Sequence, residues 1–128
     1  MPEVTFPYMR RELQYAVRAL ADDSFQMRVW GRHQLPNERY SYSFEMALHT
    51  LLDDSGLENS REELIGVILV SDSEFSVLSD LVAVALAAIA DIGLKGTYND
   101  AQGRTSWRRV IEFAARATAV LGYSGEFP

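Results

Sequence analysis

The chain of 128 residues contains no cysteine. This absence excludes a disulfide framework, a thiolate metal site and a cysteine nucleophile. The first residues, Met1–Val4, also lack the basic and apolar regions of a secretory signal. With no sign of export or of disulfide chemistry, we expect a cytoplasmic protein.

Long hydrophobic runs are absent as well. The longest uninterrupted apolar run is Leu81–Ala90, bounded by Asp80 and Asp91, and it is shorter than the ~20 residues that a membrane crossing needs. The run therefore predicts a buried core helix. A formal net charge of -6 argues against binding to nucleic acid or to an anionic membrane, because both require a cationic surface. The negative charge is compatible with a basic protein partner.

Recognised catalytic motifs are missing too. The chain has no His-Glu-x-x-His, no Gly-x-Ser-x-Gly and no phosphate-binding glycine loop. Its two histidines, His33 and His49, have no third ligand at the spacing of a zinc site. The acidic stretch Asp53–Glu58 has its glycine at the fourth position, whereas a calcium loop needs it at the sixth. We predict no catalytic, cofactor-binding or metal-binding residues, and no cofactor.

Apolar residues that recur every three or four positions predict an all-α protein. We expect one domain over residues 1–128, a compact bundle of five or six helices around a central apolar helix at about 74–92. The other expected helices cover about 5–22, 25–31, 42–56, 61–70 and 107–121. In this arrangement the helix at 107–121 packs beside the central one, so Leu86, Ile89, Val110 and Ala114 should share a core.

Local signals place several helix ends. Ser60–Glu63 and Ser71–Glu74 both match the capping box, in which a serine and a glutamate satisfy each other's free backbone N–H groups. Gly93 and Gly122 should end the two longest helices, and 95–103 reads as a loop. The sequence of residues 61–70 favours a short helix, but a strand is the alternative because the run Ile65–Val70 is rich in β-branched residues.

Exposed tyrosines often contact partners, because their large rings carry a hydrogen-bonding tip. Tyr40, Tyr42 and Tyr98 are candidates for such contacts. The alternative is that they cover the ends of the helical core. The spacing Arg108–Glu112–Arg116 predicts an exposed face with i,i+4 ion pairs, and a DNA-recognition helix is the alternative that the acidic total disfavours.

Several patterns together resemble a group of small, uncharacterised helical proteins of actinobacteria. They are an arginine-bearing first helix with a Leu-x-Asp element, a Gln-x-x-x-Trp helix, a Leu-x-Asp-Asp turn, an Ile-Gly step and a Trp-x-x-Val helix. In this chain they fall at Arg10–Asp22, Gln26–Trp30, Leu51–Asp54, Ile65–Gly66 and Trp107–Val110. The resemblance implies an all-helical domain, and it implies neither an activity nor a functional residue.

Three functions remain open on the sequence alone. The first is a non-enzymatic protein-interaction module, such as an immunity- or antitoxin-like neutraliser of a basic partner. The second is a structural homodimer or regulatory subunit, because a helix that is apolar on nearly every side must be surrounded. The third is an enzyme with an unrecognised site, and the missing motifs argue against it.

Overall fold

The computed structural model describes residues 4–31, 44–54, 61–93 and 96–122. Within these ranges the regular elements are all helical, and one isolated bridge joins Ile65 to Leu69. In chain order they are α1 (Pro7–Ala21), α2 (Asp23–Phe25), the π-helical turn η1 (Gln26–Gly31), α3 (Phe44–His49), the π-helical turn η2 (Thr50–Asp54), α4 (Arg61–Leu64), α5 (Asp72–Ile92), α6 (Tyr98–Ala101) and α7 (Thr105–Leu121). The predicted all-α bundle is confirmed.

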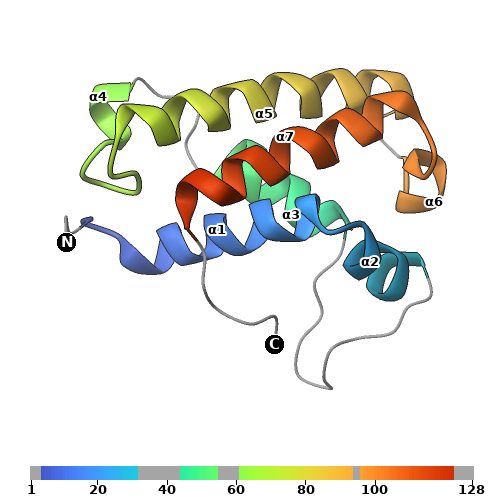
Figure 1. The fold of residues 1–128 in the computed structure, drawn as a ribbon, viewed down its shortest axis with the longest axis horizontal. Coiled ribbons are helices and arrows are strands. Elements are labelled where there is room, and N and C mark those ends of the chain that lie inside the picture. The colour runs from blue at the N-terminus through green and yellow to red at the C-terminus, as the bar shows by residue number, and fades with distance from the viewer. Residues whose placement is uncertain (1–3, 32–43, 55–60, 94–95, 123–128) are drawn as a thin grey trace.

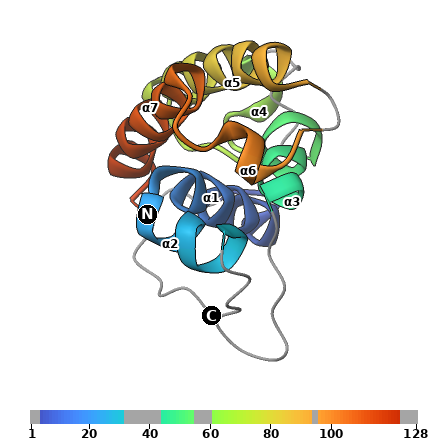
Figure 2. The ribbon, with the colours of Figure 1, turned by 90° about the vertical axis from the view of Figure 1, so that its right-hand side faces the viewer.

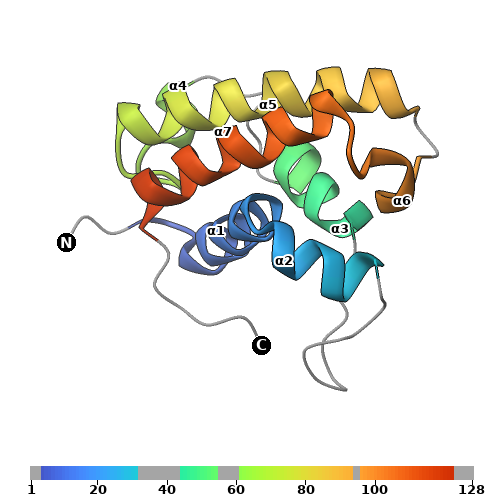
Figure 3. The ribbon, with the colours of Figure 1, turned by 45° about the vertical axis from the view of Figure 1, so that its right-hand side comes forward.

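The middle of the bundle is α7, which packs against α5 on one side and α1 on the other (Figure 1). Its buried stripe includes Ala114 and Ala117, and such small side chains let neighbouring helices approach closely. The predicted helix at 74–92 is therefore present, but it lies along the edge of the bundle and not at its centre. Figures 2 and 3 show the same edge position of α5, with α3 beside α1.

One stripe of α5 is buried, and it consists of Glu74, Leu78, Leu81, Ala85 and Ala88. The predicted shared core is confirmed for Val110 and Ala114, both fully buried. It is wrong for Leu86, whose exposed fraction is 54%, and Ile89 is only half-buried. The reason is geometric: at 3.6 residues per turn, Leu86 lies on a different side of α5 from Leu81, Ala85 and Ala88, while Ile89 lies at the edge of their stripe.

The first helix begins and ends where the sequence predicts. Pro7 lies in its opening turn, where a missing N–H removes no intrahelical bond. Asp22 follows its last residue, and the Asp22 carboxylate accepts the backbone N–H of Phe25 at 3.0 Å. Asp22 thus caps the helical segment formed by α2 and η1, which runs through Trp30 to Gly31.

The predicted helix over 61–70 ends at Leu64, so its second half is wrong, and the strand alternative does not form either. Gly66 adopts φ 90°, a left-handed conformation that a helix does not contain. The resulting turn pairs with the chain start: Thr5 N–H donates to Gly66 O at 3.0 Å and Phe6 N–H to Val67 O at 2.9 Å. The capping serine predicted at Ser60 lies outside the described residues.

The long helix keeps only half of its predicted capping box. Ser71 Oγ accepts the N–H of Glu74 at 3.3 Å, while the Glu74 carboxylate accepts the N–H of Val70 at 2.8 Å. Gly93, at φ 104°, follows the last residue of α5. The predicted loop at 95–103 contains a short helix, α6, which Thr97 and Asp100 begin with a complete capping box.

As a whole, α5 is longer and more apolar than its uninterrupted run suggests. It has 21 residues, a mean hydropathy of 2.0 over its most apolar window and 22% of that window buried. By length and composition alone, this one helix among the described residues could cross a membrane. The run Leu81–Ala90 thus underestimates the length of the apolar helix. That the segment does not cross a membrane stays a prediction.

Candidate functional site

Two buried polar contacts connect helices of the bundle to one another. The first joins α1 to α5: Arg10 Nη1 lies 2.7 Å from Glu74 Oε1, and Arg10 Nη2 lies 2.7 Å from Glu74 Oε2. Arg10 also donates to Ile68 O at 3.0 Å. With side chains 16% and 3% exposed, the two charges depend on each other. Their pairing fixes both helices to the turn that follows α4.

The second contact joins the α2–η1 segment to α7. Gln26 is completely buried, and its side-chain oxygen accepts the indole N–H of Trp107 at 3.0 Å. Its side-chain nitrogen donates to Ala19 O at 3.0 Å and to Leu20 O at 2.8 Å. Both donors of the buried amide and one acceptor position of its oxygen are therefore used inside the fold, which makes Gln26 a structural residue.

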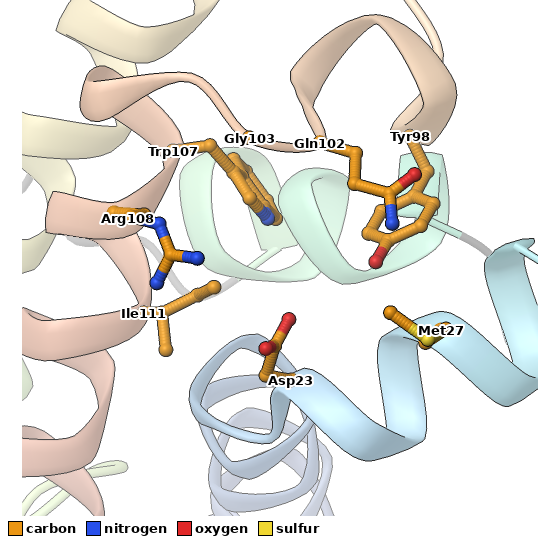
Figure 4. Close-up of a pocket in the computed structure, with 8 residues that line it drawn as sticks. All are labelled: Asp23, Met27, Tyr98, Gln102, Gly103, Trp107, Arg108 and Ile111. Atoms are coloured by element: carbon orange, nitrogen blue, oxygen red, sulfur yellow. The ribbon is translucent and has the colours of Figure 1, made fainter.

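A pocket of about 190 Å³ lies beside this contact, where α2, α6 and α7 meet (Figure 4). It is lined by Asp23, Met27, Tyr98, Gln102, Gly103, Trp107, Arg108 and Ile111. Figure 4 shows the Asp23 carboxylate, the Arg108 guanidinium and the Tyr98 hydroxyl directed into the same space. A small pocket with a few convergent polar groups is the usual form of a ligand site.

Electrostatics couple two of these pocket residues. Burial raises the pKa of the Tyr98 phenol above its usual value of 10.0, and the nearby negative charge of Asp23 raises this pKa further. Tyr98 therefore stays neutral at physiological pH. Its ring packs edge-on against Trp30, with ring centroids 5.8 Å apart, and this contact anchors α6 on η1.

Hydrogen bonds around the end of α5 stabilise the other side of α6. The hydrogen bond from Ser106 lowers the pKa of Asp91, and Arg104 lies 3.4 Å from the same carboxylate. Backbone and side-chain hydrogen bonds from Thr97 lower the pKa of Asp100. Ser106 donates to Asp91 at 2.7 Å, and Arg104 is the residue that precedes α7.

A second candidate site is an apolar surface on α5, which we call the outer stripe: Phe75, Val82, Leu86 and Ile89. These residues recur at helical spacing, and all are half-buried or exposed. The exposed alanines Ala83, Ala87 and Ala90 lie beside them. Because eleven residues make about three helical turns, Asp80 and Asp91 lie on one side of α5. At 3.6 residues per turn this side is about 120–160° around the helix from the outer stripe, so the two carboxylates do not border it.

The residues that the sequence singled out are spread over the fold. Tyr40 and Tyr42 lie outside the described residues. Tyr98 is 4% exposed, so the exposure on which its partner role depended is absent, and it lines the pocket instead. The pocket residues Asp23 and Arg108 were missed as a pair, because no local spacing connects positions so far apart in the sequence.

The expected ion pairs of α7 form in part. Arg116 lies 2.7 Å from Glu112, an exposed i,i+4 pair, and the Arg116 guanidinium lies 4.6 Å from the centre of the Phe113 ring. Arg108 points into the pocket instead (Figure 4). In the described part of the chain, no three His, Asp or Glu side chains gather closely enough to hold a metal ion.

Comparisons with known proteins place the chain in a family. No curated protein and no solved structure matches it. A family model described as a domain of unknown function, DUF7945, matches residues 4–126. Since this match covers nearly the whole chain, the protein belongs to that family.

Proposed function

We propose that the protein is a non-enzymatic interaction module that binds a protein partner through the outer stripe of α5. The observation that carries the proposal is the position of Leu86, a leucine 54% exposed in the most apolar helix of the fold. Exposed apolar surface of this kind is unfavourable in water unless another surface covers it. The role of an immunity- or antitoxin-like neutraliser agrees with such a surface.

The net charge of the chain indicates what kind of partner fits. The chain carries a net charge of -6. We therefore expect the partner to present an apolar helix and to carry a net positive charge. Opposite net charges would accelerate association of the two proteins.

A second copy of this chain fits the outer stripe less well. Each copy carries a net charge of -6, and like net charges repel on association. An anionic membrane is disfavoured by the same net charge.

The test uses two synthetic helical peptides with the same leucine–alanine face, one with lysine and the other with glutamate at its polar positions. The lysine peptide should bind at least about tenfold more tightly than the glutamate peptide, and added salt should weaken it. Leu86→Glu should abolish binding. Val120→Glu is the matched control, because Val120 is 41% exposed on a different helix, α7, and it should leave binding unchanged.

Other occupants of the outer stripe give different results. If sedimentation at micromolar concentration shows a dimer that Leu86→Glu dissociates, the stripe binds a second copy and the proposed partner chemistry is wrong. If the protein sediments with lipid vesicles and Leu86→Glu prevents it, the stripe binds a membrane. Equal binding of both peptides would likewise overturn the proposal. The actinobacterial grouping and the cytoplasmic location remain predictions.

A further inference from the structure

The pocket between α2, α6 and α7 places two opposite charges around one small space. Asp23 is the first residue of α2 and Arg108 lies near the start of α7. Both side chains point into the pocket (Figure 4). Among the described residues, they form no ion pair with each other. A carboxylate and a guanidinium that face one cavity without pairing can each bind an opposite charge on a ligand.

The remaining walls supply neutral hydrogen-bonding groups and apolar contact. The Gln102 amide can donate and accept, and the neutral Tyr98 hydroxyl can do both as well. Met27 is 39% exposed at the pocket, so a ligand would cover apolar surface there. The indole N–H of Trp107 already donates to Gln26. Trp107 therefore offers a ligand its ring and not its donor.

We infer that this pocket binds a small zwitterion of the α-amino acid class, with its ammonium group at Asp23, its carboxylate at Arg108 and a short apolar side chain against Met27 and Ile111. The volume of about 190 Å³ supports this size, because sites for drug-sized ligands usually span roughly 300–1,000 Å³. Arginine suits a carboxylate because its planar guanidinium donates two parallel hydrogen bonds. This inference is independent of the outer stripe.

The experiment titrates the purified protein with L-alanine, L-valine, L-leucine and L-phenylalanine, followed by calorimetry and by tryptophan fluorescence, since Trp107 lines the pocket. At least one amino acid should bind saturably below about 10 mM. For the tightest one, the amide, which lacks the carboxylate, and the N-acetyl derivative, which lacks the ammonium, should each bind at least about tenfold more weakly.

Two variants test which charged group of the ligand each side chain binds. Asp23→Asn should weaken binding of the amino acid at least about tenfold, so that it no longer binds more tightly than the N-acetyl derivative. Arg108→Gln should weaken it similarly, so that it no longer binds more tightly than the amide. The matched controls are Arg109→Gln and Asp80→Asn, whose side chains do not line the pocket, and they should bind like the unchanged protein. Circular dichroism would verify that all four variants remain folded.

Each outcome of these titrations either supports or overturns the inference. Saturable binding with both charge assignments supports the inference. No binding by any of the four amino acids at about 10 mM overturns it. Equal binding of the amide or the N-acetyl derivative overturns it as well, because then the ligand is not recognised as a zwitterion. An equal loss in Arg109→Gln would attribute the effect to general charge and not to the pocket.

Discussion

Arg10 and Glu74 form a bidentate ion pair between α1 and α5, with both nitrogen–oxygen distances at 2.7 Å. The same carboxylate also accepts the backbone N–H of Val70. One buried glutamate thus connects the first helix, the turn after α4 and the start of α5. Because the stripe of α5 that faces the core begins at this residue, the pair acts together with the packing of α5 on α7 to orient the helix.

We predict that Glu74→Gln lowers the free energy of unfolding by about 3–5 kcal/mol, because it leaves the Arg10 guanidinium buried without its opposite charge. Urea denaturation followed by circular dichroism measures the loss. The double variant Arg10→Met with Glu74→Leu should be less destabilised than Glu74→Gln, since removing both charges removes the unpaired one. A double variant as unstable as the single one would contradict this account.

The exposed pair Arg116–Glu112 is the control for this experiment. Its two atoms also lie 2.7 Å apart, but both side chains are 59% exposed. Breaking it with Glu112→Gln should change the free energy of unfolding by no more than about 1 kcal/mol, because water solvates and screens both charges. A similar loss at both sites would show that burial does not set the strength of the first pair.

A second prediction concerns Gln26. Gln26→Met keeps a similar volume but leaves the Trp107 N–H and the carbonyl groups of Ala19 and Leu20 without this partner. Each buried polar group that loses its hydrogen bond costs about 1–3 kcal/mol, so we expect a marked fall in thermal stability. Trp107 fluorescence should also change. Gln102→Met, at an exposed position, is the control and should leave thermal stability unchanged.

Much of the helical framework could be predicted from the sequence because its signals are local. Asp22, Ser71 and Gly122 mark helix ends through their own backbone and side-chain chemistry, and the structure has these ends as expected. The Thr97–Asp100 capping box was equally local, yet the surrounding glycine and polar residues were interpreted as a loop. The helix expected through Val70 failed because Gly66 takes a positive φ.

The arrangement of the helices could not be predicted in the same way. The apolar residues of α5 form two stripes, one through Leu81 and one through Leu86, and periodicity does not say which of them faces the core. The choice depends on long-range contacts, the packing of α5 on α7 and the pairing of Arg10 with Glu74. The pocket likewise joins Asp23 to Arg108, and only the packing of α2, α6 and α7 brings these two residues together.

A third prediction compares the two leucines of α5. Leu81→Ala should lower the free energy of unfolding by about 2–5 kcal/mol, because its side chain is fully buried. Leu86→Ala should change it by no more than about 0.5 kcal/mol, because the side chain is largely exposed. Denaturant unfolding of both variants at low protein concentration measures the difference. A large loss for Leu86→Ala would mean that a second copy covers this residue under those conditions.

The last prediction concerns alkaline pH. The pKa of Tyr98 in the folded protein lies above its value of 10.0 in the unfolded chain, through burial first and the charge of Asp23 second. Its contribution to stability is therefore fully present below pH 10.0 and is lost as pH rises through the folded pKa. Asp23→Asn should lower the pKa of Tyr98, but not fully to 10.0, because burial remains. Ultraviolet absorbance of tyrosinate, with Tyr98→Phe subtracted, measures this titration, and Asp80→Asn should leave it unchanged. If Asp23→Asn also leaves it unchanged, the Asp23 carboxylate does not face the phenol across the pocket.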